Sequence, residues 1–326
     1  MEKIIKKIMS KIEKEPSDTY IEDLNDQPLK KEKFKKIPLK KDTGKSAFLD
    51  GGSSEIFKSP GISVFFNRIY YSIYENNKRV KNKKYDFFSF ISAEKKKEKI
   101  IFSAELVDNE FKFPVLEFDS MDPRLKTGAT RAEISKVGNI IRRLCEIHIA
   151  GKIPEKNCLV VVDGSLEIKY PYEKDFLKKT LSSGNIISGL SKTCALLSSH
   201  GDSVLASLNK LSCFDSWYYP AGKVDETETY FVKLIKDSNY IFRFDIIKSD
   251  DFGIDKIISI LRKNSIDPVF LGYPYGLVEA DKMARISNRE SEGIKMRLLM
   301  KIQKHEKKLK PYLNCLNAHD ILDNIG

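Results

Sequence analysis

The sequence predicts an α/β fold with one mixed β-sheet, flanking helices and a β-rich elaboration. Apolar strand patterns separated by short polar turns fill residues 47–118, as in a run of antiparallel strands. A long amphipathic helix pattern over 130–150 then feeds a short apolar strand at 158–162. With 326 residues, the chain is long enough to bury a large core as one domain with an insertion or as two domains.

The first 45 residues are polar, Lys-rich and irregular. Apolar residues recur at helical spacing near the start, which predicts a short amphipathic helix ending before Pro16; they are Ile4, Ile5, Ile8, Met9 and Ile12. We expect residues 1–45 to form a basic N-terminal arm, either disordered or docked on a partner. Residues 46–326 should form one domain with a β-rich insertion at about 60–125.

Four strand patterns predict the insertion: 61–66, 69–74, 86–91 and 99–104. The helix over 130–150 follows. Its apolar stripe includes Val137, Ile141 and Leu144, and Thr130 with Glu133 has the pattern of a capping box. Downstream, the patterns predict helices at 172–181, 192–210 and 255–264, a strand at 185–190, a hairpin of strands 229–236 and 240–247, and one long C-terminal helix over 280–308.

The formal net charge of +11 is unevenly distributed. Nine Lys or Arg residues lie within 77–99 and seven within 295–310. Either run alone is most simply a solvated surface. The two together, beside a carboxylate site, favour a polyphosphate partner such as nucleic acid. Aromatic residues interleave with the first run, but their alternating spacing favours the buried face of a strand over base stacking.

Five cysteines stand at 145, 158, 194, 213 and 315, none at CxxC spacing. Their odd number and spacing argue against a zinc ribbon or a disulfide framework and favour a reducing compartment. No apolar run is long enough to span a bilayer, and the N-terminus has no signal-peptide pattern. We therefore expect a cytoplasmic protein without a membrane partner.

The most informative feature is a pair of apolar strands that each lead into Asp-Gly. Asp50 follows Ala47-Phe48-Leu49, and Asp163 follows Leu159-Val160-Val161-Val162. Each Asp alone is equally well explained as the cap of a turn in which Gly supplies a positive φ. Two carboxylates set side by side on one sheet repel each other, and a divalent cation relieves that repulsion most directly. The pair predicts a metal-dependent enzyme.

A third carboxylate should come from the helix before the second strand. Glu146 lies in the otherwise apolar stretch Leu144-Cys145-Glu146-Ile147, where a carboxylate is costly unless it is paired or ligates a metal. Glu133 is the competitor, but helix capping explains its place. Asp-Gly-Ser turns also occur in actin-like ATPases, which would need a late Gly-Gly turn, whereas the only Gly-Gly here is Gly51-Gly52.

A further island, residues 271–282, contains Tyr273-Pro274-Tyr275 just before the start of a helix. This arrangement would place a phenol and a carboxylate on one wall of a site. The alternative is a turn with core aromatic residues.

Six short sequence motifs, taken in their order along the chain, resemble the NurA nuclease family. They are Asp50-Gly51-Gly52-Ser53, Arg142-Arg143-Leu144-Cys145-Glu146, Val162-Asp163-Gly164-Ser165-Leu166, Gly189-Leu190-Ser191-Lys192-Thr193, Tyr230-Phe231-Val232-Lys233-Leu234 and Gly272-Tyr273-Pro274-Tyr275. The resemblance covers about residues 45–300 and implies an RNase H-like fold. It also implies a manganese-dependent DNA nuclease with 5′–3′ exonuclease activity on single- and double-stranded DNA and single-strand endonuclease activity. Such proteins form homodimers and act with the hexameric ATPase HerA in end resection for recombinational repair.

The resemblance carries the family's metal carboxylates onto Asp50, Glu146 and Asp163, its basic residue onto Lys192, and its tyrosine onto Tyr273. Two Mn²⁺ ions, or Mg²⁺ in their place, would be bound. The family has a His eight residues after that tyrosine, where this chain has Asp281. Asp281 can add a metal ligand but cannot act as a neutral imidazole donor. His319 is a candidate spatial substitute.

The alternative function, supported by Asp281, is a catalytically weak NurA-like protein that serves as a DNA-binding or HerA-docking module.

Overall fold

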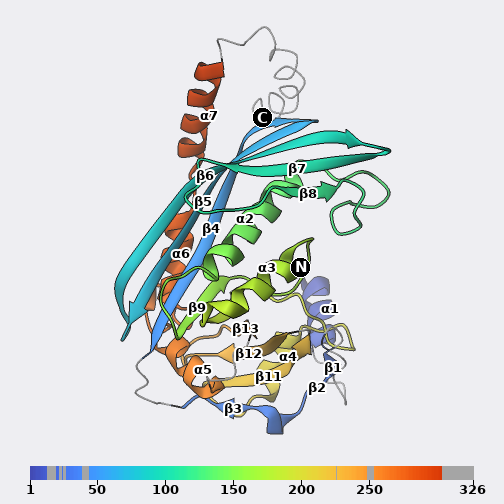
Figure 1. The fold of residues 1–326 in the computed structure, drawn as a ribbon. Coiled ribbons are helices and arrows are strands. Elements are labelled where there is room, and N and C mark those ends of the chain that lie inside the picture. The colour runs from blue at the N-terminus through green and yellow to red at the C-terminus, as the bar shows by residue number, and fades with distance from the viewer. Residues whose placement is uncertain are drawn as a thin grey trace.

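The computed structural model describes residues 1–12, 20–21, 24, 27–38, 44–224, 226–247 and 253–302. An eleven-stranded mixed sheet runs through them in the order β3-β11-β12-β13-β10-β9-β4-β5-β6-β7-β8 (Figure 1). A separate two-stranded sheet is formed by β1 (Tyr20–Ile21) and β2 (Gln27–Pro28). The predicted mixed α/β sheet is therefore confirmed.

The large sheet contains β3 (Lys35–Lys36), β4 (Lys45–Ser59), β5 (Ile62–Glu75), β6 (Lys78–Lys96), β7 (Lys99–Val107), β8 (Leu116–Asp119), β9 (Cys158–Asp163), β10 (Ile186–Ser191), β11 (Trp217–Val224), β12 (Thr227–Lys233) and β13 (Phe242–Ile247). The α-helices are α1 (Glu2–Ile12), α2 (Ser135–Ala150), α3 (Glu173–Thr180), α4 (Val204–Leu211), α5 (Ile254–Lys263), α6 (Tyr275–Ala284) and α7 (Asn288–Ile302). The 3₁₀ turns that the structure describes in full are η2 (Lys31–Lys33), η3 (Leu181–Ser183) and η4 (Pro268–Phe270).

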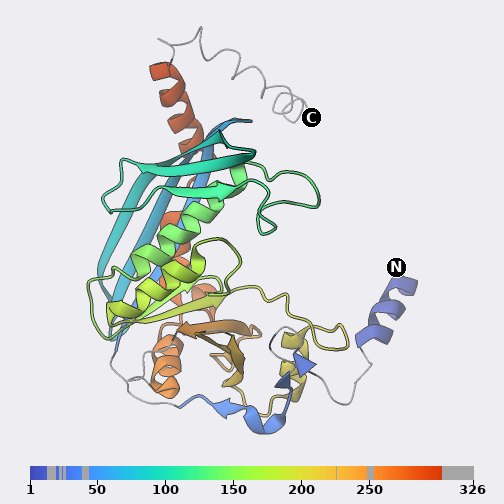
Figure 2. The ribbon, with the colours of Figure 1, turned by 45° about the vertical axis from the view of Figure 1, so that its right-hand side comes forward.

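The centre of the sheet consists of β10, β9 and β4, which run parallel to one another, while the other neighbouring pairs are antiparallel. Helices cover both faces. The α2–α3 side is in front of β4 in Figure 1, and α6 with α7 lies behind it; Figure 2 shows the same layers from the side. Because both faces are covered, β9 is an uninterrupted apolar run, as is typical of buried parallel strands.

Alternate residues of β9 supply the two cores. Val160 and Val162 join Ile141 and Leu144 of α2 in one cluster. Leu159 and Val161 pack on the other side, with Phe48 of β4, Ile258 of α5 and Leu277 of α6 in the same cluster. The long β4–β5–β6 ribbon, the predicted β-rich elaboration, extends from this centre (Figures 1 and 2).

The predicted single C-terminal helix is wrong, because two helices occupy that stretch. Helix α6 ends at Ala284 and α7 begins at Asn288. The backbone N–H of Glu290 donates to the side chain of Ser287, an N-terminal cap with Glu three residues later, which is the sequence signature of a new helix start. The described part of the predicted 280–308 helix ends at 302.

Two other helix predictions need correction. Helix α2 begins at Ser135, and Thr130 donates to the Thr127 carbonyl, so the predicted Thr130–Glu133 capping box does not form. Within 192–210 only α4, from Val204, is helical. The preceding residues instead form bends and turns in which the Ser198 backbone N–H donates to Asp202.

Part of the predicted N-terminal arm is packed into the protein. Ile21, Leu24 and Phe34 share a core cluster with Trp217, and β3 pairs with β11. By contrast, Ile4, Ile5, Ile8 and Met9 of α1 are exposed. Among the described residues, no helix is long and apolar enough to cross a membrane.

Candidate metal centre

Three carboxylates from three different elements converge at the centre of the sheet. Asp50 lies in β4, Asp163 is the last residue of β9, and Asp281 lies in α6. Each offers one carboxylate oxygen, and these oxygens all lie within 4.8 Å of one another. All three side chains are only partly buried, so the cluster is accessible to a ligand. An all-oxygen set of this kind suits a hard divalent cation.

Asp50 does not end its strand in a turn, although the sequence pattern had suggested one at Asp50-Gly51. Strand β4 continues through Gly51 and Gly52 as far as Ser59. The two glycines are needed for close packing: a β-carbon on Gly51 would clash with the Glu146 carboxylate, and one on Gly52 would clash with the Ala284 carbonyl. The Gly-Gly pair therefore lets α2 and α6 approach β4 from opposite sides.

Asp163, by contrast, stands where β9 ends and a turn begins, as predicted. Gly164 has a φ of 105°, in the left-handed region. Asp245 of β13 is fully buried and accepts from the Leu166 backbone N–H at 3.0 Å. Arg143 donates to the Ser165 carbonyl from the other side. These two contacts fix the turn that presents the Asp163 carboxylate.

Lys192 and Tyr273 both contact the cluster. The Lys192 Nζ lies 2.7 Å from Asp163 Oδ2 and 3.2 Å from Asp281 Oδ1. Burial opposes the charge of Lys192, but bonding to Asp163 and Asp281 outweighs it and raises its pKa. The Tyr273 hydroxyl donates to Asp163 at 3.2 Å. Burial and the negative charge of Asp163 raise the Tyr273 pKa, so the phenol stays protonated and acts as a hydrogen-bond donor.

Glu146 lies beside the cluster but outside the group of three. It is buried and forms ion pairs with Arg142 and, at 3.7 Å, with Arg143. Burial raises the Glu146 pKa, and the two arginines oppose that rise. Glu133, its competitor in the sequence, is mostly exposed and lies 3.5 Å from Lys58.

The carboxylates of the site repel one another, and a divalent cation would relieve that repulsion. Burial, together with the charges of Glu146 and Asp163, raises the pKa of Asp50 to about 8. A divalent ion beside these oxygens would reverse that effect, because it stabilises the ionised carboxylate. The donor set therefore fits a divalent metal.

Several charged residues around the site were not predicted from the sequence to contribute to it. Arg142, Arg143 and Asp245 fix Glu146 and the Asp163 turn, and Arg285 donates to Asp281 at 3.0 Å. Arg142 and Arg143 stand four and three residues before Glu146, respectively, which is the helical spacing of ion pairs, and that signal was available. Asp245 had no local signal. His319 lies outside the described residues.

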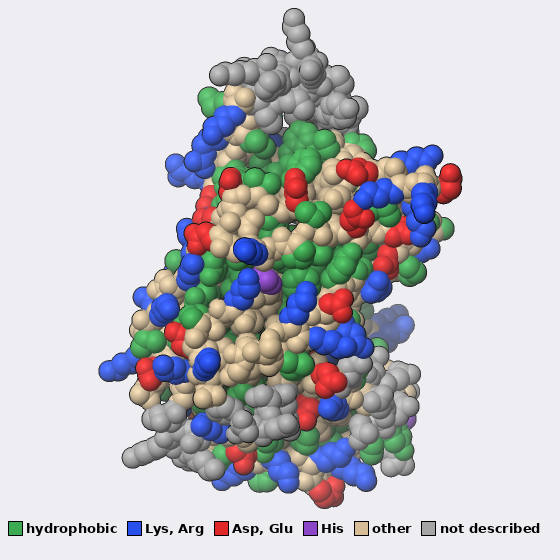
Figure 3. All heavy atoms as spheres, viewed as in Figure 1, with side chains coloured by type: hydrophobic (Ala, Val, Ile, Leu, Met, Phe, Trp, Pro, Cys, Tyr) green, Lys and Arg blue, Asp and Glu red, His purple; other side chains and the backbone are tan. Residues whose placement is uncertain are grey.

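The basic run at 77–99 is largely ion-paired within the protein. Six of its Lys and Arg side chains pair with Asp or Glu, which are Arg79 with Glu279, Lys81 with Glu155, Lys83 with Glu110, Lys84 with Asp86, Lys96 with Glu117 and Lys99 with Asp119. On the face shown in Figure 3, Asp and Glu are interspersed among the Lys and Arg side chains. Phe87 is buried and Tyr85 packs against the same core cluster, as their alternating spacing predicted, whereas Phe88 packs against a separate cluster and Phe90 is only partly buried.

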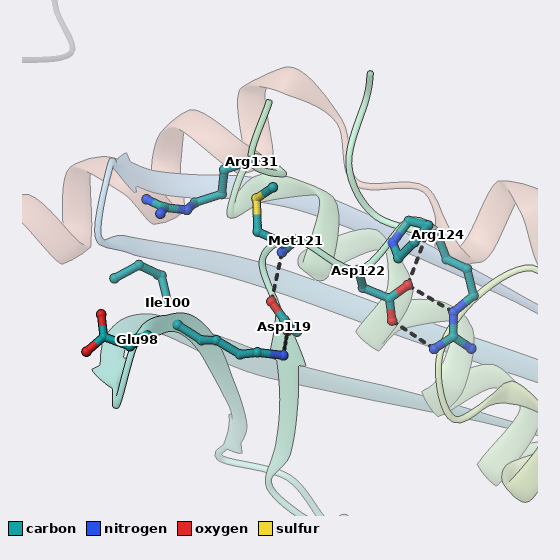
Figure 4. A pocket seen from close by; sticks show the side chains of 9 residues that line it. Glu98, Ile100, Asp119, Met121, Asp122, Arg124 and Arg131 are labelled. Carbon is teal, nitrogen blue, oxygen red and sulfur yellow. Dashed lines mark hydrogen bonds and ion pairs between the residues drawn. The ribbon is translucent and has the colours of Figure 1, made fainter. Parts of the chain in front are cut away.

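An open pocket of about 620 Å³ lies away from the three carboxylates, at β7 and β8. Lys99 pairs with Asp119, and Arg124 with Asp122, so its charges are balanced locally (Figure 4). None of the predicted site residues lines this pocket.

The fold is similar to that of solved nucleases. The crystal structure of the NurA nuclease from Sulfolobus solfataricus matches with a TM-score of 0.54 and 16% identity, covering 93% of this chain and 95% of that one. A Ciona intestinalis endonuclease V, solved in complex with DNA, gives a TM-score of 0.39 and 11% identity, covering 77% of this chain and 87% of that one. Human ENDOV gives 0.39 and 10%, with 74% and 83% covered.

The sequence matches no protein-family model and no curated protein. At 16% identity, the likeness to the NurA nuclease is one of fold. It confirms the predicted RNase H-like α/β architecture over nearly the whole chain.

Proposed function

We propose that this protein is a metal-dependent DNA nuclease that hydrolyses phosphodiester bonds. The observation that carries the proposal is the convergence of Asp50, Asp163 and Asp281 within 4.8 Å at the centre of an RNase H-like sheet. The similarity of the fold to that of a NurA nuclease supports it. Isolated carboxylates would repel DNA phosphates, so a role in DNA chemistry requires a cation at this cluster.

In this proposal Asp50, Asp163 and Asp281 hold divalent metal, Mn²⁺ or Mg²⁺, with Glu146 as a further ligand once it exchanges its arginine partners. Two such ions in a nuclease activate water and stabilise the leaving oxygen. Lys192, which already lies at the cluster, neutralises the phosphate to be cleaved. Tyr273 orients a phosphate oxygen or the water, because its phenol keeps its proton.

The finer proposals rest on the resemblance to the NurA family. They are 5′–3′ exonuclease activity on single- and double-stranded DNA, single-strand endonuclease activity, a homodimer, and partnership with a HerA-type hexameric ATPase in end resection. Residues 46–326, together with Ile21, Leu24, Phe34 and β3, which pack on them, would form the nuclease unit. The apolar stripe of the N-terminal helix, Ile5, Ile8 and Ile12, is the proposed contact with the ATPase, and Ile5 and Ile8 are exposed.

Digestion of end-labelled single- and double-stranded DNA tests the proposal. We expect cleavage with Mn²⁺, none with EDTA, and none by Asp163→Asn, which removes one ligand charge at nearly constant volume. Asp237→Asn, at an exposed position outside the cluster, is the matched control and should cut like the wild type. Wild-type rates for Asp163→Asn would show that the metal site is misassigned.

The alternative of a catalytically weak binding module gives a different result. Because Asp281 replaces the family's His, such a protein would bind DNA or the ATPase without cutting under any metal condition. Cleavage that depends on Asp163 excludes this alternative.

A further inference from the structure

A second cavity, of about 620 Å³, opens beside the N-terminal end of α6. Three segments distant in sequence form it: the β5–β6 hairpin, the connection after α5, and α6 itself. The residues that matter for its chemistry are Tyr74, Asn77, Arg79, Asn264, Tyr275 and Glu279.

The walls of this cavity are held rigidly by one buried amide. Asn264 Nδ2 donates to Asn77 Oδ1 at 2.9 Å, which ties the hairpin to the connection after α5. Asn264 Oδ1 accepts from the Gly276 N–H, and its carbonyl accepts from the Tyr275 N–H, each at 2.7 Å. These bonds fix the start of α6 and therefore the place of Tyr275.

The cavity presents hydrogen-bond donors and an acceptor close together. The Glu279 carboxylate, only 9% exposed, accepts from the Tyr70 hydroxyl at 2.8 Å and the Tyr74 hydroxyl at 2.6 Å. Arg79 pairs with the same carboxylate while half of its side chain remains exposed. Tyr275, 38% exposed, adds an accessible aromatic ring.

The cavity and the three carboxylates are built on shared elements, the paired strands β4 and β5 and helix α6. Tyr70, which bonds to Glu279, is the cross-strand partner of Asp50. Tyr74 lies four residues further along β5, a distance of roughly 13 Å. Glu279 precedes Asp281 by two residues on α6. Because residues two apart point to nearly opposite sides of a helix, Glu279 and Asp281 face different sides of α6, and a DNA strand with one phosphate at the carboxylates would pass over α6 to bring a later nucleotide to the cavity.

The local charge favours a base over a phosphate. Arg79 is offset by Glu279, and Asp267 adds a further carboxylate to the lining, so a phosphate would meet net negative charge. A nucleobase carries both donors and acceptors on its edge and a face that stacks on aromatic rings. The cavity offers partners for each of these.

We propose that this cavity is a subsite for one unstacked nucleobase of the DNA strand, with Tyr275 as its stacking platform and Arg79 and Glu279 facing the base edge. The proposal rests on the nuclease function and deepens it, because it assigns a single-stranded stretch to the DNA on the far side of α6 from the cleaved phosphate.

Fluorescence anisotropy with single-stranded oligonucleotides tests the subsite, with Ca²⁺ as the metal and the absence of cleavage checked. One strand is intact, and a series carries a single abasic site at successive positions. We expect Tyr275→Ala to weaken binding of the intact strand about tenfold, at the low end for one base–aromatic stack. Tyr275→Phe, which keeps the ring, should bind like the wild type. Tyr170→Ala, at a similarly exposed tyrosine, is the control and should also bind like the wild type.

The abasic series supplies the decisive comparison. At one position in the series, removal of the base should weaken binding by the wild type as much as Tyr275→Ala weakens binding of the intact strand. On that abasic strand, Tyr275→Ala and the wild type should bind equally well. An equal loss by Tyr275→Ala on every strand, or no loss on any, overturns the subsite while DNA binding by the wild type stands. If the wild type binds no strand, the proposed function itself fails.

Discussion

Gly51 of β4 faces the Glu146 carboxylate of α2 so closely that no β-carbon fits between them. Gly51→Ala should therefore displace Glu146 and cost about 1–3 kcal/mol of stability through overpacking, together with most of the nuclease activity. Thermal unfolding and the DNA digestion assay measure the two effects. Gly61→Ala, at a position with nothing within 4 Å of an added β-carbon, is the control. Equal stability and equal nuclease activity of the two variants would show that the close contact between Gly51 and Glu146 affects neither property.

The role of Glu146 can be separated from that of Glu133. Glu146→Gln should reduce cleavage as much as Asp163→Asn does, because it removes a buried charge beside the site and breaks the ion pairs that Glu146 makes with Arg142 and Arg143. Glu133→Gln should leave the rate unchanged, since Glu133 is exposed and does not cap α2. Initial cleavage rates decide between them, and the reverse pattern would mean that Glu133 is the functional carboxylate.

The pKa of Asp50 predicts a specific pH dependence in the metal-free protein. Its pKa is about 8 in the folded chain against an ordinary 3.8, so the folded state holds a proton that the unfolded state releases. This stabilisation is fully present below pH 3.8 and is lost as the pH rises to about 8. Calorimetry in EDTA should therefore show the melting temperature of the wild type falling relative to Asp50→Asn over that window. Melting temperatures of the wild type and Asp50→Asn that change in parallel with pH would contradict the raised pKa of Asp50.

The stabilisation of the protein by Mn²⁺ should instead increase as the pH rises. Because a ligand carboxylate must be ionised, Mn²⁺ should release a proton from Asp50 below about pH 8 and stabilise the protein more as the pH rises. In Asp50→Asn this gain should be small at every pH.

Asp281 is predicted to act as a metal ligand in place of the family's His. Asp281→Ala should raise the Mn²⁺ concentration needed for half-maximal rate by about tenfold or more and lower turnover. Asp281→His should retain activity with a shifted pH profile, because an imidazole titrates near neutral pH. Lys282→Ala, at the exposed neighbouring position, is the control. An unchanged metal requirement in Asp281→Ala would leave Asp281 only its ion pairs with Lys192 and Arg285.

The docking role of the N-terminus calls for a short deletion. Residues 21, 24 and 34 are part of a core cluster with Trp217, so removal of the whole predicted arm would damage the fold. Deleting residues 1–12 should weaken co-elution with a HerA-type ATPase and leave basal nuclease activity intact. Unchanged co-elution would place the docking surface elsewhere.

Local sequence patterns were sufficient to predict features that depend on a single strand or turn. The apolar run at 158–162, the alternating aromatic residues of β6 and the Asp163-Gly164 turn were each predicted and are present. The helix break at 285–287 was missed, although Ser287 and Glu290 have the pattern of a cap. The strand through Gly51 and Gly52 was mistaken for a turn because glycine has the same local signature whether it supplies a positive φ or makes room for a neighbour.

Short segments of the sequence were enough to predict the α/β class, the importance of Asp50 and Asp163, and Glu146 as an unusual carboxylate in an apolar helix, since periodicity and burial cost are properties of short segments. The family resemblance suggested Asp281 as a ligand, but the three-dimensional packing was needed to place it beside Asp50 and Asp163. The same packing shows that two arginines hold Glu146 and that Asp245 anchors the Asp163 turn. These relationships join residues from different strands and helices, and their distances depend on how α2 and α6 pack on the sheet.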